Sequence, residues 1–276
     1  MSDIPPFLKW AGGKRWLVSR YPHFLPGSFA RYYEPFLGSG AVFFWMNPKR
    51  GGIIADVNTD LINAYNEVRN RPTELIERLR MHQRDHDDDY YYQVRESIPR
   101  TGLDKAARLI YLNRTCWNGL YRVNRRGKFN VPRGTKNTVV SEDEDFFSVS
   151  RALQHIKIRR WDFEKTIDAA QTDDFVFVDP PYTVKHNFNG FAKYNEKIFN
   201  WEDQIRLAKA VNRASLRGVK ILVTNADHPS VRSLYEDVGE IHPLPRASII
   251  SGSNAGRGST TEIVVVVNYL VQKAAP

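Results

Sequence analysis

The sequence predicts an α/β fold with a mostly parallel sheet, interrupted in the middle by a basic insertion. Two observations predict it. Strand-like runs alternate with helical runs at both ends of the 276-residue chain, which is the pattern of βαβ units. Between residues 69 and 139 the alternation stops and basic residues accumulate. We therefore expect one α/β domain that carries an inserted segment.

Two strand–turn–helix units open the chain. In residues 31–47 an aromatic strand leads into a glycine turn at 36–40 and then into an apolar helix. In residues 51–68 a short apolar strand ends at Asp56, and a helix with one apolar face follows. Turns that link a strand to a helix are where open α/β sheets bind ligands.

The glycine turn resembles part of a nucleotide-binding fingerprint. Gly38 and Gly40 open a helix, and Asp56 lies 18 residues after Gly38, where an acidic residue can bind ribose hydroxyls. The fingerprint is incomplete, because Phe43 stands where a third glycine is expected. The turn therefore suits a nucleoside without a pyrophosphate, such as S-adenosylmethionine. A plain structural turn is the alternative.

The middle of the chain reads as helices followed by a hairpin. Residues 70–97 and 104–118 have helical patterns, and residues 119–134 alternate around a central Arg-Gly as β-hairpins do. Residues 101–137 hold nine Lys and Arg against one acid, a charge of +8 out of the chain's net +9. A charge this focused indicates a polyanion site, most simply nucleic acid, with a solvated basic face as the alternative.

Core strands are predicted again in the C-terminal half. Apolar runs lie at 175–178, 219–225 and 262–270, and an amphipathic helix at about 201–216 follows the first run. That first strand runs directly into Asp179-Pro180-Pro181-Tyr182. A carboxylate, two rigid rings and an aromatic side chain are thus placed at the carboxyl end of a buried strand.

The Asp179–Tyr182 segment suits the task of holding a planar exocyclic amine. Such a nitrogen is a poor nucleophile because its lone pair is delocalised into the ring. A carboxylate and a main-chain carbonyl can accept its two N–H groups, and the prolines fix φ and keep that carbonyl aimed. The Tyr182 ring can stack on the base, and positioning against a methyl sulfonium then supplies most of the catalysis. A strand simply ended by two prolines is the structural alternative.

Composition and short motifs exclude several classes of protein. No apolar run reaches the roughly 18 residues of a membrane helix and no signal segment is seen, so we expect a cytoplasmic protein without a membrane partner. The single Cys116 excludes intramolecular disulfides and a cysteine-rich metal site, and we expect no metal. Residue 8 is Leu and Arg15 follows Lys14, so residues 9–14 are not a phosphate loop and ATP is disfavoured.

Five motifs in order resemble the DNA adenine-N6 methyltransferases of the alpha group, especially the DNA adenine methylase family that methylates GATC. They are FLKWAGGK (7–14), EPFLGSGAVF (34–43), ADVNTDLINAYN (55–66), YLNRTCWNGLYRVNRRGKFNVPRG (111–134) and DPPY (179–182). The resemblance implies a seven-stranded Rossmann-like methyltransferase sheet. It also implies an inserted DNA-recognition domain that contains helices and a β-hairpin.

The resemblance also implies a division of the chain and an activity. Residues 1–68 and 140–276 would form the S-adenosylmethionine-dependent catalytic domain, and residues 69–139 the target-recognition domain. The enzyme would transfer a methyl group to N6 of an adenine in double-stranded DNA, within GATC. The base would be flipped out of the stack first, at a cost of a few kcal/mol.

Residues in both halves match the family's positions for the methyl donor. Trp10 and Phe163 offer apolar faces and Lys14 a cation, although a core Trp and a solvated Lys are the structural alternatives. The catalytic positions are Asp179, Pro180, Pro181 and Tyr182. The donor positions are Trp10, Lys14, Glu34, Phe36, Gly38, Gly40, Asp56, Asp162, Phe163 and Asp179.

The basic segment matches the family's DNA-reading positions. Arg122 matches the residue that reads the first guanine, and Arg is suited to bidentate contact with guanine O6 and N7. Trp117 stands where the family often has a ring wedged into the duplex. The other basic residues are expected to contact phosphates, which position the protein without specifying sequence. The expected DNA-binding set is Lys9, Arg114, Trp117, Asn118, Leu120, Arg122, Asn124, Arg125, Arg126, Lys128, Pro132 and Arg133.

Two alternatives differ in class from this activity. One is a DNA-binding protein on a catalytically dead methyltransferase scaffold, which the intact Asp179–Tyr182 and glycine motifs argue against. The other is an amino methyltransferase that acts on cytosine N4, RNA adenine or a protein Gln. Asp before the prolines favours adenine, and the basic hairpin favours nucleic acid. We expect a monomer, because one flipped base needs one active site.

Overall fold

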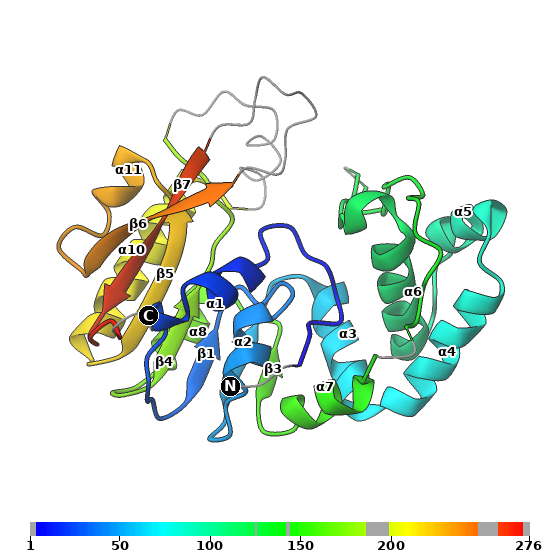
Figure 1. Ribbon diagram of the computed structural model, residues 1–276, viewed down its shortest axis with the longest axis horizontal. Coiled ribbons are helices and arrows are strands. Elements are labelled where there is room, and N and C mark those ends of the chain that lie inside the picture. The colour runs from blue at the N-terminus through cyan, green and yellow to red at the C-terminus, as the bar shows by residue number, and fades with distance from the viewer. Residues whose placement is uncertain (1–3, 125, 142–143, 186–198, 248–258, 273–276) are drawn as a thin grey trace. The chain divides into compact units, whose positions relative to one another are not determined.

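The computed structural model describes residues 4–124, 126–141, 144–185, 199–247 and 259–272 (Figure 1). The chain divides into two compact units. The N-terminal unit comprises residues 1–20 and 37–160, and the C-terminal unit comprises residues 21–36 and 161–276. In the described part of the chain, no helix is long and apolar enough to cross a membrane.

The described residues form a seven-stranded sheet in the order β3-β2-β1-β4-β5-β7-β6. Parallel pairing joins β2 to β3, β1 to β4 and β4 to β5, whereas β7 is antiparallel to both β5 and β6. The strands are β1 (Tyr32–Glu34), β2 (Gly52–Ala55), β3 (Lys157–Arg159), β4 (Phe175–Val178), β5 (Lys220–Ala226), β6 (Glu240–Ala247) and β7 (Ser259–Val267). The predicted α/β fold with a seven-stranded, mostly parallel sheet is confirmed.

The N-terminal unit contains the helices that were predicted between residues 59 and 115. Its helices are α1 (Arg15–Arg20), α2 (Ala41–Met46), α3 (Thr59–Asn70), α4 (Pro72–Arg84), α5 (Asp88–Glu96), α6 (Gly102–Thr115) and α7 (Phe146–Leu153). Helices α4 and α5 both pack on α6, as Figure 1 shows. Helix α5 begins in an acidic run, where Asp87 caps it by accepting from Tyr90 N at 2.8 Å.

The predicted hairpin at residues 119–134 is present as a turn without regular strands. Its pairing consists of isolated bridges, Cys116 with Arg133 and Val123 with Phe129. Main-chain bonds still cross it, among them Asn124 N to Lys128 O at 2.8 Å. Pro132 has no N–H to donate, which helps to keep the ladder short.

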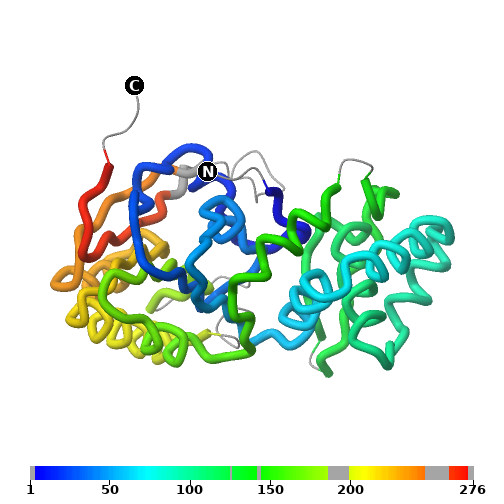
Figure 2. The backbone as a smooth tube through the Cα atoms, turned by 90° about the horizontal axis from the view of Figure 1, so that it is seen from below, coloured from blue at the N-terminus to red at the C-terminus, as the bar shows by residue number. Residues whose placement is uncertain are grey.

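The C-terminal unit places a buried strand beneath two neighbouring helices. All four residues of β4 are buried. Its helices are α8 (Phe163–Asp168), α10 (Trp201–Leu216) and α11 (Pro229–Arg232). Helix α10 begins with a capping box between Asn200 and Asp203 and packs beside α8 (Figure 2). The amphipathic helix that was predicted at about 201–216 is therefore confirmed.

Candidate functional site

The glycine turn of the N-terminal unit requires glycine at two positions. Gly38 and Gly40 have φ of +47° and +64°, in the left-handed region that costs other residues free energy. A Cβ at Gly40 would lie 2.8 Å from Tyr65 Oη, and one at Gly38 would lie 2.9 Å from Trp10 Cδ1. Tyr65 Oη in turn donates to Gly38 O at 3.1 Å. The turn is thus fixed by both its conformation and its packing.

Asp56 faces this turn from the end of β2. Its Oδ2 accepts from Gly38 N at 3.2 Å and its Oδ1 accepts from Asn58 N at 2.9 Å. The pKa of Asp56 is raised, because the effect of burial is larger than the opposite effect of the N–H groups of Asn58 and Gly38. Each carboxylate oxygen keeps acceptor capacity beyond its N–H bond, so Asp56 can receive hydroxyl donors. A ribose diol fits this carboxylate.

Trp10 and Lys14 lie in the same unit. The Trp10 ring stacks on Tyr121, with centroids 5.1 Å apart and planes 21° apart. Lys14 is 3% exposed, and its Nζ donates to Gly12 O at 2.8 Å. Lys14 is therefore a buried cation and not a solvated one. The structure brings Trp10 and Asp56 into contact with the same residue, Gly38.

In the C-terminal unit, the Asp179–Tyr182 segment follows β4 and two buried polar side chains hold it. Thr224 Oγ1, on β5, donates to Asp179 Oδ1 at 2.6 Å. Tyr182 Oη donates to Glu262 Oε2, on β7, at 2.7 Å. Burial raises the pKa of Tyr182 well above its ordinary value, and Asp179 and Glu262 raise it further. The phenol thus stays a neutral donor at physiological pH.

Sequence reasoning missed Thr224 and Glu262. Both are polar residues in otherwise apolar strands, and both are buried, at 1% and 4% exposure. A polar side chain inside a buried strand needs a hydrogen-bond partner. The presence of Thr224 and Glu262 in apolar runs is therefore the sequence feature that could have indicated them. The partner itself lies far away in the sequence and only the fold brings it near.

The remaining donor candidates of the C-terminal unit gather around Phe163. Its ring stacks on Phe36, with centroids 5.4 Å apart, and the Arg206 guanidinium lies 4.2 Å from the ring centroid. Asp162 caps α8 and binds Arg206 through both carboxylate oxygens. Glu34 is 2% exposed and accepts from Tyr32 Oη at 2.8 Å.

Several predicted DNA-reading side chains are exposed in the N-terminal unit. Arg122 is exposed and is steadied by Asn130, to which its Nε donates at 2.9 Å. Trp117 is 53% exposed and Asn118 adopts a left-handed conformation beside it. The exposed set also includes Lys9, Asn124, Arg126, Lys128 and Pro132, whereas Leu120 is half-buried and Arg125 lies outside the described residues. Asn124 Oδ1 accepts from the N–H groups of Arg126 and Lys128 and so shapes the turn.

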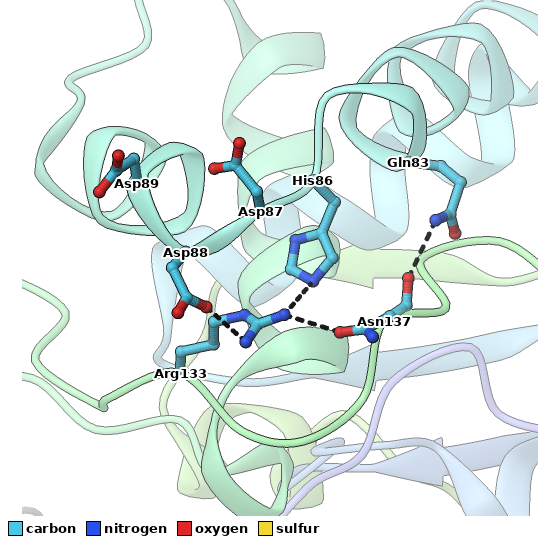
Figure 3. Close-up of a pocket in the computed structure, with 7 residues that line it drawn as sticks. All are labelled: Gln83, His86, Asp87, Asp88, Asp89, Arg133 and Asn137. Atoms are coloured by element: carbon cyan, nitrogen blue, oxygen red, sulfur yellow. Dashed lines mark hydrogen bonds and ion pairs between the residues drawn. The ribbon is translucent and has the colours of Figure 1, made fainter.

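Arg114 and Arg133, which the sequence predicts to contact phosphates, both have acceptors within the N-terminal unit. Arg114 pairs with Glu144 and donates to Phe7 O at 2.9 Å. Arg133 pairs with Asp88 and donates to Asn137 Oδ1 at 2.7 Å, with His86 beside the same guanidinium (Figure 3). Each side chain thus has a carboxylate and a further oxygen acceptor within the N-terminal unit.

Asn113 is a third residue that the sequence did not reveal. It is 1% exposed in the interior of α6, and its side chain donates to both Lys9 O and Gly119 O, at 2.8 and 3.0 Å. It also accepts from Lys9 N at 2.9 Å. A hydrogen bond with Lys136 and burial lower the pKa of Lys9. Asn113 thus joins Lys9 to the turn that presents Trp117 and Asn118.

No metal centre is evident in the residues that the structure describes. They include no group of three or more His, Cys, Asp or Glu side chains arranged to hold a metal ion. The polar groups around Asp56 and Asp179 are hydrogen-bonded to N–H and O–H donors.

Comparison with known proteins agrees with this geometry. A family profile for the D12 class N6 adenine-specific DNA methyltransferases matches residues 10–249. The chain is 38% identical over 276 residues to the Type II methyltransferase M1.LlaDCHI of Lactococcus lactis subsp. cremoris, covering 97% of this chain and 96% of that protein. It is 37% identical to the Type II methyltransferase M.MjaIII of Methanocaldococcus jannaschii, covering 81% and 85%. It is 31% identical to a DNA adenine methylase of Vibrio cholerae, covering 94% and 95%. The chain therefore belongs to the D12 class of N6 adenine-specific DNA methyltransferases.

Proposed function

We propose that this enzyme transfers the methyl group of S-adenosylmethionine to N6 of an adenine that is flipped out of duplex GATC. We further propose that it acts as a cytoplasmic monomer. The observation that carries the proposal is the Asp179 carboxylate at the end of β4, held by Thr224 at 2.6 Å. A carboxylate fixed in this way is a pre-oriented acceptor for the amino group of a base.

The Asp179–Tyr182 segment would raise the nucleophilicity of the amine. Asp179 accepts one N–H group, and a main-chain carbonyl fixed by Pro180 and Pro181 accepts the other. The nitrogen then moves toward tetrahedral geometry and its lone pair becomes available. When bound, S-adenosylmethionine supplies an electrophilic methyl group to that lone pair. Tyr182, held by Glu262, would present its ring to the flipped base.

Each unit carries residues that we propose for donor binding. Asp56 would accept the ribose hydroxyls, because two backbone N–H groups already orient its carboxylate. Asp162 and Phe163 would hold the adenine end. Trp10 and Lys14 would complete the donor set, with Phe36, Gly38 and Gly40 shaping the loop.

The recognition of GATC would depend on the exposed side chains of residues 117–132. Arg122 would bind the first guanine through its guanidinium, which Asn130 keeps extended. Trp117 would enter the stack that the flipped adenine leaves. Lys9, Arg126 and Lys128 would contact phosphates. The target-recognition domain would correspond to residues 69–139. Similarity to proteins named DNA adenine methylase supports adenine as the target base.

The test uses purified protein, labelled S-adenosylmethionine and two duplexes of equal composition, one of which contains GATC. Label in N6-methyladenine on the GATC duplex alone is the expected result. Label on both duplexes would retain the reaction and remove the specificity. Label on neither duplex, with the protein folded and the donor bound, would favour a catalytically inactive scaffold.

A further inference from the structure

Arg206 on α10 is the centre of a compact polar cluster in the C-terminal unit. Its Nη1 donates to Asp162 Oδ1 at 3.0 Å and its Nη2 donates to Asp162 Oδ2 at 3.0 Å. The same two nitrogens also bind Glu164 and Asp203, at 3.3 and 3.0 Å. All four terminal N–H groups of the guanidinium are therefore used. The guanidinium carbon, Cζ, lies 4.2 Å from the centroid of the Phe163 ring.

These bonds determine how many further hydrogen bonds the Asp162 carboxylate can accept. Its Oδ1 accepts from both Arg206 and Glu164 N, so both lone pairs of that oxygen are used. Among the residues that the structure describes, only Arg206 donates to its Oδ2, which leaves that oxygen one lone pair. The Asp162 side chain is 43% exposed, so a ligand can reach that lone pair. The fork of Arg206 fixes the direction in which it points.

We infer that Arg206 is a positioning residue, which aims Asp162 Oδ2 at the exocyclic amine of the donor's adenine. The inference rests on the proposed donor site. Without Arg206, Asp162, Glu164 and Asp203 would lose the cation that they share, and only Glu164 would keep another among the described residues, Arg213. Repulsion among the carboxylates would then displace Asp162. The Phe163 ring would also lose its contact with the Arg206 guanidinium. Arg206 would thus set the selectivity of the site for an adenine over a purine that lacks the amino group.

A pair of ligands tests this role without turnover. S-adenosylhomocysteine carries the amino group, and S-inosylhomocysteine has a carbonyl oxygen in its place. Calorimetric titration of the wild-type enzyme should show a preference of roughly 10- to 150-fold for the adenosyl ligand, as expected for a hydrogen bond to a charged acceptor. Arg206→Gln should reduce that ratio to a few-fold by weakening the adenosyl ligand. Arg206→Lys, which keeps the charge but not the fork, should give an intermediate ratio.

Arg213→Gln is the matched control, because Arg213 lies on the same helix and pairs with Glu164 and Asp168 but not with Asp162. It should keep the wild-type ratio. An unchanged ratio in both Arg206 variants, or an equal loss in the control, would overturn the inference. A wild-type enzyme that binds both ligands equally would also overturn it while leaving the donor site in place. Failure of the wild-type enzyme to bind S-adenosylhomocysteine would instead refute the proposed donor site as well.

Discussion

Replacement of Gly40 by Ala tests how the glycine turn is built. Gly40 has φ of +64°, and a left-handed conformation costs a residue with a Cβ about 1–2 kcal/mol. The new Cβ would also lie 2.8 Å from Tyr65 Oη and 3.2 Å from Phe44 Cε2. Tyr65 and Phe44 are fully buried, so neither ring can move away cheaply, and overpacking adds about 1–3 kcal/mol. The free energy of unfolding should fall by about 2–5 kcal/mol.

Gly127 provides the control for the conformational part of this cost. Its φ is +74°, and a Cβ there would meet nothing within 4 Å. Gly127→Ala should therefore cost only about 1–2 kcal/mol. Urea denaturation of both variants measures the two losses, and their difference reports the contact with Tyr65.

A double-mutant cycle isolates the contribution of the contact between the new Cβ and Tyr65 Oη. Tyr65→Phe removes the hydroxyl, which costs about 0.5–1.5 kcal/mol for the lost bond to Gly38 O. It also removes the atom that lies nearest to the new Cβ. Gly40→Ala should then cost at least about 1 kcal/mol less in the Tyr65→Phe background. Additive losses, or equal losses for Gly40→Ala and Gly127→Ala, would refute this account of the turn.

Three further predictions concern other parts of the N-terminal unit. Arg122→Ala should relax discrimination at the first base of the site by ~1–3 kcal/mol in methylation competition assays, and an unchanged sequence preference would contradict its assigned role. Burial raises the pKa of Cys116 from 9.0 to about 11, which lowers the fraction of reactive thiolate at pH 8. Alkylation at pH 8 should therefore be roughly 100-fold slower in the native than in the urea-unfolded protein. Equal alkylation rates would contradict the burial of Cys116. Burial lowers the pKa of His82 from 6.5 to about 4, so its contribution to stability is complete above pH 6.5 and is lost as pH falls toward 4. The loss should approach about 3 kcal/mol and should disappear in His82→Gln, as measured by denaturation at each pH.

The parts of the fold that were predicted from sequence have strong local signals. The turn at Gly38 and Gly40, the acid at Asp56 and the buried strand before Asp179 each combine a hydrophobic pattern with a characteristic residue. Strand β6 had no such signal, because Pro243 and Pro245 argue against a strand. It lies at the end of the strand order, where a missing N–H is tolerated.

The structure adds contacts between residues that are distant in the sequence. Composition showed that Arg114 and Arg133 are basic but could not show that Glu144 and Asp88 neutralise them. The same limit hid Arg206, whose bonds to Asp162 span 44 residues. Charge counting predicts that a segment binds a polyanion, whereas the division between surface and internal arginines is decided by packing.

The most direct test of the central claim identifies the methylated nucleoside made by the wild-type enzyme and by Asp179→Ala. Duplex DNA containing GATC would be incubated with each protein and S-adenosylmethionine, digested to nucleosides and analysed by mass spectrometry, with denaturation curves to confirm that both proteins are folded. We predict N6-methyladenine with the wild-type enzyme and none above background with Asp179→Ala. A different methylated nucleoside, or comparable N6-methyladenine from folded Asp179→Ala, would contradict the account.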